Sequence, residues 1–547
     1  MRSRAFAFLI LVIMLIVVSP LLVAVSPPVG AVESGQVLYS PNLQVHPKGK
    51  AGYPRGIQLQ YGAGSGTLLA TFAREGEHAP TSLPIFRSGD QGKTWKLISS
   101  IRSHTDGWDI EAPTLFEVPF TRNGLKAGDI LAAGTAWKRK NYTAQKIEVF
   151  LSRDQGRSWE YLSNCTETKN LPNTWGHGIW EPAFLMTSDG RVGCYISDER
   201  PANSRTNNQV IGHYLSRDGA RTWEPNFTQD VAFPSDNLQR PGMQTFAKLP
   251  DGRTVMSYEL CRDATDPDHA CEVFIKFSED GFHWGPLDDP GILVSTADHR
   301  HLLHTPLISW MKGGGPHGTL VLTGQRVTAG HVGDERVLEE SGSVMLVNTS
   351  MGKGDWREVA LPLSVVPTGA YAEGLPSCPG YSSPVIPLGE NGNYVYLAAT
   401  WLGVGDQCEI RFARGKLPLD TGQLVGPGQQ CLDVDTNTSR NGNPAQLWNC
   451  NEASGQRWNL TPDGAIESLG KCLDVDAQGT SNFTKVQLWE CNGTGAQKWK
   501  LRADGSLFNP QSAKCLDAPQ GRVENGTHLQ IYECNGLWTQ RWRLSRR

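Results

Sequence analysis

A short apolar stretch recurs along the first 420 residues, most copies with a proline near the start and several running into a polar glycine turn. The six copies are YPRGIQL from Tyr53, EAPTLFEV from Glu111, EPAFLMTSDG from Glu181, MQTFAKLPDG from Met243, TPLISWMKGG from Thr305 and SPVIPLGENG from Ser383. A short apolar run bounded by turn residues predicts a β-strand. The chain therefore repeats one strand in every unit of roughly 63 residues.

A second pattern, S-x-D-x-G-x-T/S-W, keeps the same period. It reads SGDQGKTW from Ser88, SRDQGRSW from Ser152, SRDGARTW from Ser216 and, shortened, SEDGFHW from Ser278. In this motif the Asp accepts hydrogen bonds from the following backbone, the Gly permits a positive φ, and the Trp packs between sheets. The motif is therefore predicted to fold turns and not to carry catalysis.

A unit of this length holds four strands and their turns, which is one blade of a β-propeller. From Tyr39 to about Asp420 the chain has room for six units. We therefore expect an all-β protein with a six-bladed β-propeller over residues 32–420. The recurring apolar stretches are then the innermost strands, whose first residues face the central channel.

From Cys431 a different repeat begins. Its three units start with CLD at Cys431, Cys472 and Cys515, end in QRW or QKW, and are about 42 residues long. They strongly resemble the ricin-B-type β-trefoil lectins. The resemblance implies a β-trefoil over residues 431–547, after a Gly- and Gln-rich linker at 421–430. It also implies one disulfide in each unit: Cys431–Cys450, Cys472–Cys491 and Cys515–Cys534.

In that lectin family the Asp of CLD binds sugar hydroxyls, and an aromatic residue near the second Cys stacks on the sugar ring. The matching pairs are Asp433 with Trp448, Asp474 with Trp489, and Asp517 with Tyr532. The closing Gln and Trp of each unit are expected in the core. The position before the closing Gln is often Asn in binding subsites, but here it is Gly455, Ala496 or Thr539.

The propeller repeats resemble the sialidase superfamily, which is a statement about fold and not about activity. Arg55, Arg326 and Tyr381 match part of the sialidase pattern. Met243 stands where the glutamate partner of the tyrosine belongs, and Glu259 stands where the second arginine belongs. A carboxylate there would repel a sialic acid carboxylate, so sialidase activity is not expected.

A pair of carboxylates takes the place of that pattern. Glu181 begins the third inner strand, and Glu259 ends a strand of the next blade. A glycosidase for neutral sugars needs such a pair, one to protonate the leaving oxygen and one to attack or stabilise the anomeric centre. With Tyr381, this arrangement resembles the fungal exo-α-1,5-L-arabinanases over about residues 40–420. The resemblance implies catalysis by Glu181, Glu259 and Tyr381.

Further residues are expected to line the channel and to bind substrate. They are Arg55, Trp108, Asp109, Glu111, His177, Trp180 and Arg326, and Glu111 is the main competitor for a catalytic role. The six cysteines of the propeller are expected in structural disulfides. No His, Cys and Asp cluster has metal-ligand spacing and no Gly-rich phosphate loop occurs, so no metal or cofactor is expected.

The bulk properties indicate a secreted protein. An apolar run with two arginines before it ends in SPPVGA, which predicts a signal peptide over residues 1–31, with an uncleaved membrane anchor as the alternative. Nine N-x-S/T sequons and twelve cysteines suit the secretory route. With a net charge of −4 and no long basic block, neither nucleic acid nor an anionic membrane surface is expected as a partner.

Three functions stay open at this point. The first is an extracellular, monomeric, exo-acting glycoside hydrolase on plant cell-wall arabinan, held to the polysaccharide by its lectin module. The second is an enzyme of the same fold with another substrate, such as a galactan or a sialoside. The third is a non-catalytic protein that binds glycans with both domains.

Overall fold

The computed structural model describes residues 35–44, 49–75, 79–138, 143–172, 177–201, 208–234, 239–261, 271–312, 318–330, 336–366, 378–389, 392–417, 421–451, 453–460 and 464–545. The expected signal peptide lies outside these ranges. Within them the regular structure consists of β-strands and short 3-10 helices, so the all-β class is confirmed. None of the helices in these ranges has the length and apolar character that a membrane crossing requires.

In the described part of the N-terminal domain, six antiparallel sheets each provide one four-stranded blade. The blades are β2 (Lys50–Gln58), β3 (Leu68–Glu75), β4 (Leu83–Ser88) and β5 (Lys96–Ile101); β6 (Trp108–Glu117), β7 (Ile130–Lys138), β8 (Ala144–Ser152) and β9 (Glu160–Lys169); β10 (Ile179–Met186), β11 (Val192–Asp198), β12 (Val210–Ser216) and β13 (Thr228–Val231); β14 (Arg240–Lys248), β15 (Thr254–Cys261), β16 (Cys271–Ser278) and β17 (Ile292–Leu293); β19 (Leu307–Met311), β20 (Thr319–Thr323), β23 (Val344–Asn348) and β24 (Arg357–Ala360); and β25 (Val385–Leu388), β26 (Asn393–Trp401), β27 (Cys408–Lys416) and β1 (Gln36–Tyr39). A 3-10 turn, η1 (Gly62–Gly64), follows β2.

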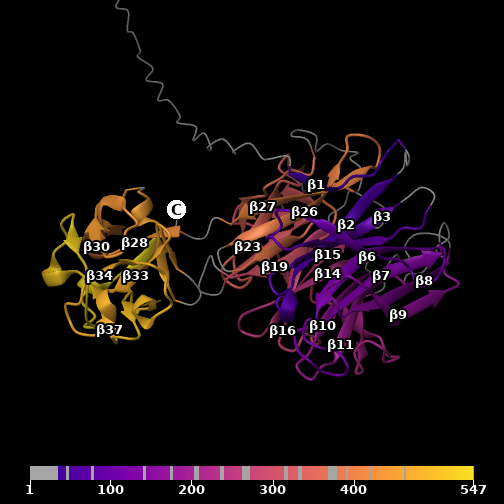
Figure 1. Ribbon diagram of the computed structural model, residues 1–547, viewed down its shortest axis with the longest axis horizontal. Coiled ribbons are helices and arrows are strands. Elements are labelled where there is room, and N and C mark those ends of the chain that lie inside the picture. The colour runs from indigo at the N-terminus through magenta and orange to yellow at the C-terminus, as the bar shows by residue number, and fades with distance from the viewer. Residues whose placement is uncertain are drawn as a thin grey trace, which may run out of the picture. The chain divides into compact units, whose positions relative to one another are not determined.

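The six inner strands form a closed ring. Each inner strand contacts the next in the order β2, β6, β10, β14, β19 and β25, and β25 contacts β2 again. The strands labelled β2, β6, β10, β14 and β19 gather in the middle of this domain (Figure 1). The N-terminal strand β1 pairs with β27 and so supplies the outer strand of the last blade. The predicted six-bladed propeller is therefore confirmed.

The S-x-D-x-G motifs fold the turns between the third and fourth strands of four blades. In the first, the Asp90 carboxylate accepts hydrogen bonds from the Lys93 and Thr94 N–H groups at 3.1 and 3.0 Å, and Gly92 has φ 76°. Asp154, Asp218 and Asp280 repeat this arrangement. The sequence search missed a fifth copy, in which Asn348 accepts from the Ser350 and Gly352 N–H groups.

A left-handed residue stands in the first half of each of the first four inner strands and two or three residues before each of the last two. These residues are Tyr53, Ala112, Glu181, Met243, Thr305 and Ser382, with φ between 47° and 57°. Such a conformation costs a non-glycine residue about 1–3 kcal/mol and persists where the surrounding structure holds it. In the first four blades it creates a bulge between the inner strand and the next one. Because of the bulge, the position that Glu181 occupies in β10 is occupied in β6 by Ala112 and not by Glu111.

The fourth blade carries an addition that the repeat did not predict. Strand β18 (Arg300–Leu303) pairs with β16 and with β21 (Arg326–Ala329), which in turn pairs with β22 (Arg336–Val337). This addition ends beside His304 and Thr305. It therefore supports the loop that enters the fifth inner strand.

The C-terminal domain is a β-trefoil of short strands and 3-10 turns. Its elements are β28 (Thr421–Val425), η2 (Pro427–Gln429), β29 (Cys431–Val434), η3 (Asp435–Asn437), β30 (Asn443–Trp448), η4 (Ser454–Gln456), β31 (Trp458–Leu460), β32 (Ile466–Ser468), β33 (Lys471–Val475), η5 (Asp476–Gln478), β34 (Val486–Trp489), η6 (Gly495–Gln497), β35 (Lys500–Leu501), β36 (Leu507–Asn509), β37 (Lys514–Asp517), η7 (Pro519–Gly521), β38 (Thr527–His528), β39 (Gln530–Glu533), η8 (Trp538–Gln540) and β40 (Arg543–Ser545).

The boundary expected between the domains needs a correction. Residues 421–425, assigned above to a linker, form β28, which pairs with β40, β31 and β29. The trefoil thus begins at Thr421 and not at Cys431. The sequence did not reveal this strand because its Gly- and Gln-rich composition suggests a loop, whereas pairing with the last strand closes the domain.

Three equivalent clusters build the trefoil core. Trp458, Trp499 and Trp542 are buried, and their indole N–H groups donate to the carbonyls of Leu432, Leu473 and Leu516 at 2.7, 2.9 and 3.2 Å. The closing Gln456, Gln497 and Gln540 are also buried, and each side-chain oxygen accepts from a backbone N–H five residues before it. The disulfides are Cys431–Cys450, Cys472–Cys491 and Cys515–Cys534 here, and Cys165–Cys194, Cys261–Cys271 and Cys378–Cys408 in the propeller.

Candidate active site

A cavity of about 400 Å³ opens at the end of the channel where the inner strands begin. Residues from several blades meet there. The lining consists of Lys50, Ala51, Gly52, Tyr53, Glu75, Glu111, Trp180, Glu181, Glu199, Gln209, Arg240, Glu259, Cys378 and Tyr381. Five of these residues are glutamates, so the cavity is strongly acidic.

Glu181 reaches the cavity from the left-handed position of β10 and is partly accessible there. Burial by the surrounding protein raises the pKa of its carboxyl to about 8, and the carboxylates of Glu259 and Glu199 add to this, while hydrogen bonds from Ser197 and from the Met243 N–H oppose it. A carboxyl in these surroundings holds a proton at neutral pH, as a general acid requires.

Glu259 enters from β15, next to Gly242 of β14 in the sheet. Its Oε2 accepts a hydrogen bond from the Thr305 N–H at 2.6 Å. Burial raises the pKa of Glu259 to about 7, and both this hydrogen bond and the Arg240 charge oppose the rise. Glu259 is therefore the more easily ionised of the two carboxyls and has one oxygen fixed by the backbone.

Thr305 connects the two sides of the site. It is buried and left-handed, which aims its N–H at Glu259, and its hydroxyl accepts from the Ser382 N–H at 3.1 Å. Ser382 follows Tyr381, so Thr305 ties the loop carrying Tyr381 to the carboxylate of Glu259. This link is absent from any local sequence pattern because its three members lie on different blades.

Tyr381 and Tyr53 form a pair in the lining of the same cavity. The Tyr53 hydroxyl donates to the Tyr381 oxygen at 3.2 Å, and the ring centroids are 4.8 Å apart in an edge-to-face arrangement. Burial raises the pKa of Tyr381, and the Glu259 and Glu181 carboxylates raise it further. Both phenols therefore stay protonated, and Tyr53 is the donor of the pair.

A second acidic group lies beside this pair. Burial raises the pKa of Glu111 well above its usual value, with a further rise from the Glu75 carboxylate and an opposing effect from Lys50. Lys50 is shared, because its Nζ lies 3.5 Å from Glu75 and 3.4 Å from Asp406. Glu111 is thus a partly accessible, protonated acid and a weaker candidate for ionised chemistry than Glu259.

An arginine that the sequence interpretation did not single out completes the wall. Arg240 donates to the carboxylate of Glu199 and to the Gln209 side-chain oxygen, the latter at 3.0 Å. Glu199 in turn accepts from the Trp180 indole N–H and the Gly178 N–H, both at 2.8 Å. The chain of contacts fixes Trp180 against the cavity and holds a positive charge near Glu259.

The structure brings some of the expected site residues together and separates others. Glu181, Glu259, Tyr381, Glu111 and Trp180 line the cavity. Trp108, Asp109, His177, Arg326 and Arg55 are not among the described residues that line it. Trp108 packs under the Lys146 ammonium group at 5.1 Å, and the buried Asp109 accepts from the Thr81 N–H at 2.7 Å. Arg326 lies on the added strand β21. Burial lowers the pKa of the neighbouring His304 to about 4, and the Arg326 charge lowers it further.

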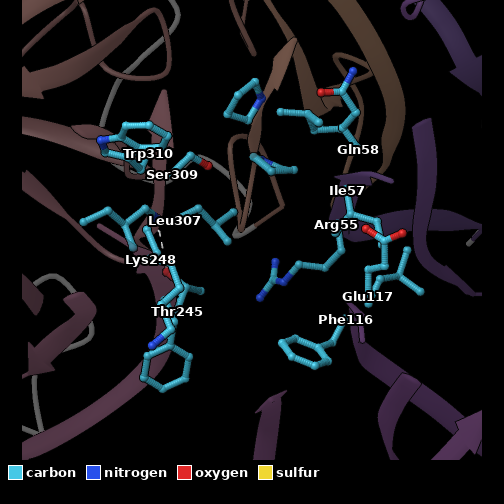
Figure 2. A pocket seen from close by; sticks show the side chains of 18 of the residues that line it. Arg55, Ile57, Gln58, Phe116, Glu117, Thr245, Lys248, Leu307, Ser309 and Trp310 are labelled. Carbon is cyan, nitrogen blue, oxygen red and sulfur yellow. Dashed lines mark hydrogen bonds between the residues drawn. The ribbon is translucent and has the colours of Figure 1, made fainter. Parts of the chain in front are cut away.

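Arg55 faces a different level of the channel. It lines a cavity of about 810 Å³ formed by the later residues of all six inner strands. Figure 2 shows its side chain extending into this space, with Thr245 and Lys248 labelled on the facing wall. Its guanidinium donates to the Pro54 and Ser382 carbonyls, and burial lowers its pKa to about 10. Arg55 therefore stabilises the loop that follows Tyr381 through its hydrogen bond to the Ser382 carbonyl.

Sequence reasoning missed Lys50, Tyr53, Glu75, Glu199, Gln209 and Arg240. Tyr53 had a signal, because it begins one of the six recurring stretches, but Arg55 drew attention instead. Lys50 and Arg240 begin the inner strands β2 and β14, three residues before the recurring stretches start, and Glu75, Glu199 and Gln209 lie on or beside second and third strands, so no repeat marks them. Two groups of possible metal ligands occur in the described ranges, Glu259 with Cys261, Cys271 and His304, and Glu467 with Cys472 and Cys491. Their cysteines are disulfide-bonded and cannot bind as thiolates.

The three expected lectin subsites share one geometry. Asp433, Asp474 and Asp517 are buried, and each accepts from a glutamine amide of the next strand at 2.8, 3.1 and 3.0 Å. Trp448 and Trp489 stand exposed beside them, and Tyr532 is partly exposed. At the third subsite Asp517 and Tyr532, with Phe483 of the second unit, line a cavity of about 370 Å³. There Thr539 donates to Asp517 at 3.0 Å.

These features define a propeller with an acidic active-site-like cavity, followed by a sugar-binding type of trefoil, and comparisons with known proteins agree. The model of the ricin-type β-trefoil lectin domain matches residues 420–542. The α-L-arabinanase of Penicillium chrysogenum, solved with arabinobiose, is similar at 24% identity and a TM-score of 0.57, covering 70% of this chain and 98% of the enzyme.

The α-L-arabinofuranosidase of Fusarium graminearum, solved with an iminosugar inhibitor, is similar at 22% identity and a TM-score of 0.57, covering 71% of this chain and 99% of that one. No curated protein matches the sequence. At such identities the likeness shows the fold. The expected layout, an arabinanase-like propeller followed by a ricin-B-type trefoil, is confirmed.

Proposed function

We propose that this protein is a secreted glycoside hydrolase that removes arabinose or arabinobiose units from the ends of α-1,5-linked L-arabinan. The observation that carries the proposal is the meeting of Glu181 and Glu259, from neighbouring blades, in one cavity beside Tyr381. Their surroundings differ, since Glu181 has the higher pKa and Glu259 has a backbone N–H donor. Two carboxyls with separate roles are what glycoside hydrolysis requires.

In the proposed mechanism Glu181 is the acid and Glu259 the nucleophile. As the bond between the anomeric carbon and the leaving oxygen breaks, Glu181 gives its proton to that oxygen and Glu259 forms an ester bond to the carbon. Ionised Glu181 then takes a proton from water, and the water oxygen displaces Glu259 from the anomeric carbon. Both groups return to their first state, and the configuration of the sugar is retained.

The charge of the cavity favours a neutral substrate. Glu75, Glu111, Glu181, Glu199 and Glu259 face only Lys50 and Arg240 among the described basic residues of the lining, and both cations already contact carboxylates. A uronic or sialic acid would bring another carboxylate into this space and be repelled. A cavity of about 400 Å³ is also at the small end of ligand pockets, which suits a chain end.

The trefoil is proposed to hold the enzyme on its substrate. Binding of one domain to a polysaccharide raises the local concentration of chain ends at the other without new catalytic contacts. This role accounts for a lectin module on the same chain as the propeller.

The product profile on linear arabinan, galactan and sialyllactose tests the proposal. We expect arabinose or arabinobiose from arabinan and no release from the other two. Glu181→Gln and Glu259→Gln are the inactive controls, because both keep the shape of the side chain and remove its acid–base chemistry. Release of sialic acid, or unchanged activity in either variant, would refute the assignment.

A further inference from the structure

One asparagine position recurs three times at the rim of the trefoil subsites. The Asn525 side-chain oxygen accepts from the N–H of Asn449, which follows Trp448, at 2.7 Å. The Asn441 oxygen accepts from the N–H of Glu490, which follows Trp489, at 3.0 Å. The Asn482 oxygen accepts from the N–H of Glu533, which follows Tyr532, at 3.1 Å. Each subsite aromatic therefore has one of these asparagines beside its backbone.

The residue after each asparagine lies against the aromatic side chain itself. A Cβ built at Gly526 would lie 3.9 Å from the Trp448 ring, and one at Gly442 would lie 3.9 Å from the Trp489 ring. At the third subsite this residue is Phe483 of the second unit, whose ring centroid is 5.3 Å from that of Tyr532 and whose side chain lines the cavity with Asp517. The asparagine thus stands one residue away from the surface on which a sugar would stack.

Two of the three positions are sequons and the third is not. Asn482-Phe-Thr and Asn525-Gly-Thr fit the N-x-T rule, whereas Asn441-Gly-Asn does not. A glycan attaches to the side-chain nitrogen, and in the described ranges Asn482 and Asn525 use only the oxygen in hydrogen bonds. By contrast, the sequon residue Asn348 is buried, and its nitrogen donates to the Lys353 and Asp355 carbonyls.

We propose that N-glycans attached to Asn482 and Asn525 cover the subsites of Tyr532 and Trp448, whereas the equivalent asparagine beside Trp489, Asn441, carries none. The glycan is a large polar group anchored one residue from each aromatic surface, and it excludes another saccharide there by occupying the same space. The inference rests on the proposed binding of sugar by the trefoil. It makes the three repeats unequal, because only the Trp489 subsite lacks a glycan at this position.

Covalent footprinting of the full chain tests the shielding without any ligand. The chain is produced in a eukaryotic secretory host, glycan occupancy is read by mass spectrometry, and exposed aromatics are oxidised with hydroxyl radicals. The Thr484→Ala and Thr527→Ala changes abolish the two sequons but keep both asparagines, and Thr484→Ser and Thr527→Ser are the matched controls that keep the sequons. Asn226→Gln removes an exposed sequon of the propeller and controls for general loss of glycan.

Oxidation of Trp448 and Tyr532 is expected to rise severalfold in the Thr→Ala chain, and oxidation of Trp489 to stay the same. The Thr→Ser and Asn226→Gln chains should match the parent. Unmodified Asn482 and Asn525 in the secreted parent, or equal oxidation of all three aromatics with and without these sequons, would overturn the proposal.

Retention on insoluble arabinan then reports on binding. In the glycosylated chain, Trp489→Ala should weaken retention by the trefoil, whereas Trp448→Ala should leave it unchanged. Without the two sequons, retention should strengthen, by up to about 10²-fold if several subsites engage one particle. If no form is retained, the binding function of the trefoil is wrong, while the footprint still decides whether the glycans cover the subsites.

Discussion

The pH dependence of kcat/KM follows from the two perturbed carboxyls. The active form needs Glu259 ionised and Glu181 protonated. Activity is lost as the pH falls through the pKa of Glu259, about 7, and as it rises through that of Glu181, about 8. The fraction in the active form then peaks at roughly 0.6 near about pH 7.5 and falls to about 0.1 at about pH 6 and pH 9. Since the two groups interact, both limbs belong to the pair.

A change at Arg240 tests whether the acidic limb of kcat/KM comes from Glu259 and not from a general effect of pH on the protein. The charge of Arg240 lowers the pKa of Glu259, and the Arg240→Met change removes it. A nearby charge in a partly buried site is expected to change a pKa by about one unit, which moves the acidic limb to about 8. The two limbs then coincide, and the maximal kcat/KM falls by about twofold. Arg240→Lys keeps the charge and should leave the acidic limb in place.

The assay is the initial rate on a linear arabino-oligosaccharide below its KM, because kcat/KM reports the groups of the free enzyme. Circular dichroism at each pH verifies that the variants stay folded, which matters because Arg240 also neutralises the nearly buried Glu199. A wild-type profile with both limbs below about pH 6, near the ordinary range of a glutamate, would refute the reasoning. If the acidic limb of the kcat/KM profile stays at the same pH in folded Arg240→Met, Arg240 does not set the pKa of Glu259.

Three further predictions concern roles and stability. Azide added to Glu259→Ala should give a glycosyl azide of inverted configuration, and azide added to Glu181→Ala should give one of retained configuration. Nuclear magnetic resonance of the products determines the configuration. The opposite pattern would exchange the roles of the two glutamates. Removal of residues 421–547 should leave hydrolysis of soluble oligosaccharides nearly unchanged and weaken retention on insoluble arabinan, so a folded but inactive propeller would contradict separate functions for the domains. Trp458→Ala should lower the free energy of unfolding of the trefoil by about 3–5 kcal/mol, because it empties a fully buried indole site, whereas the exposed Trp448→Ala should cost far less in the same denaturant titration.

Local patterns of the chain were sufficient for the architecture. The turn motif that begins at Ser88 recurs because each blade repeats the same turn, and its Asp90 contacts are made within five residues. The threefold CLD and QRW units encode the buried tryptophans of the trefoil in the same local way. Glu181 and Glu259 could be identified because they depart from the pattern of a related fold.

The sequence indicated part of the cavity lining, but only the tertiary structure decided which residues meet there. Arg240, Glu199 and Tyr381 come from different blades, and only closure of the inner-strand ring brings them to one end of the channel. The left-handed residue in or before each inner strand also sets which side chain faces which level, so that Tyr53 reaches the acidic cavity while Arg55, two residues later, faces the larger one. In the same way β28 is a strand because β40 pairs with it, although its own residues suggest a loop. Repeats report contacts between near neighbours in sequence, whereas a site at the axis of a ring depends on contacts between residues far apart in the chain.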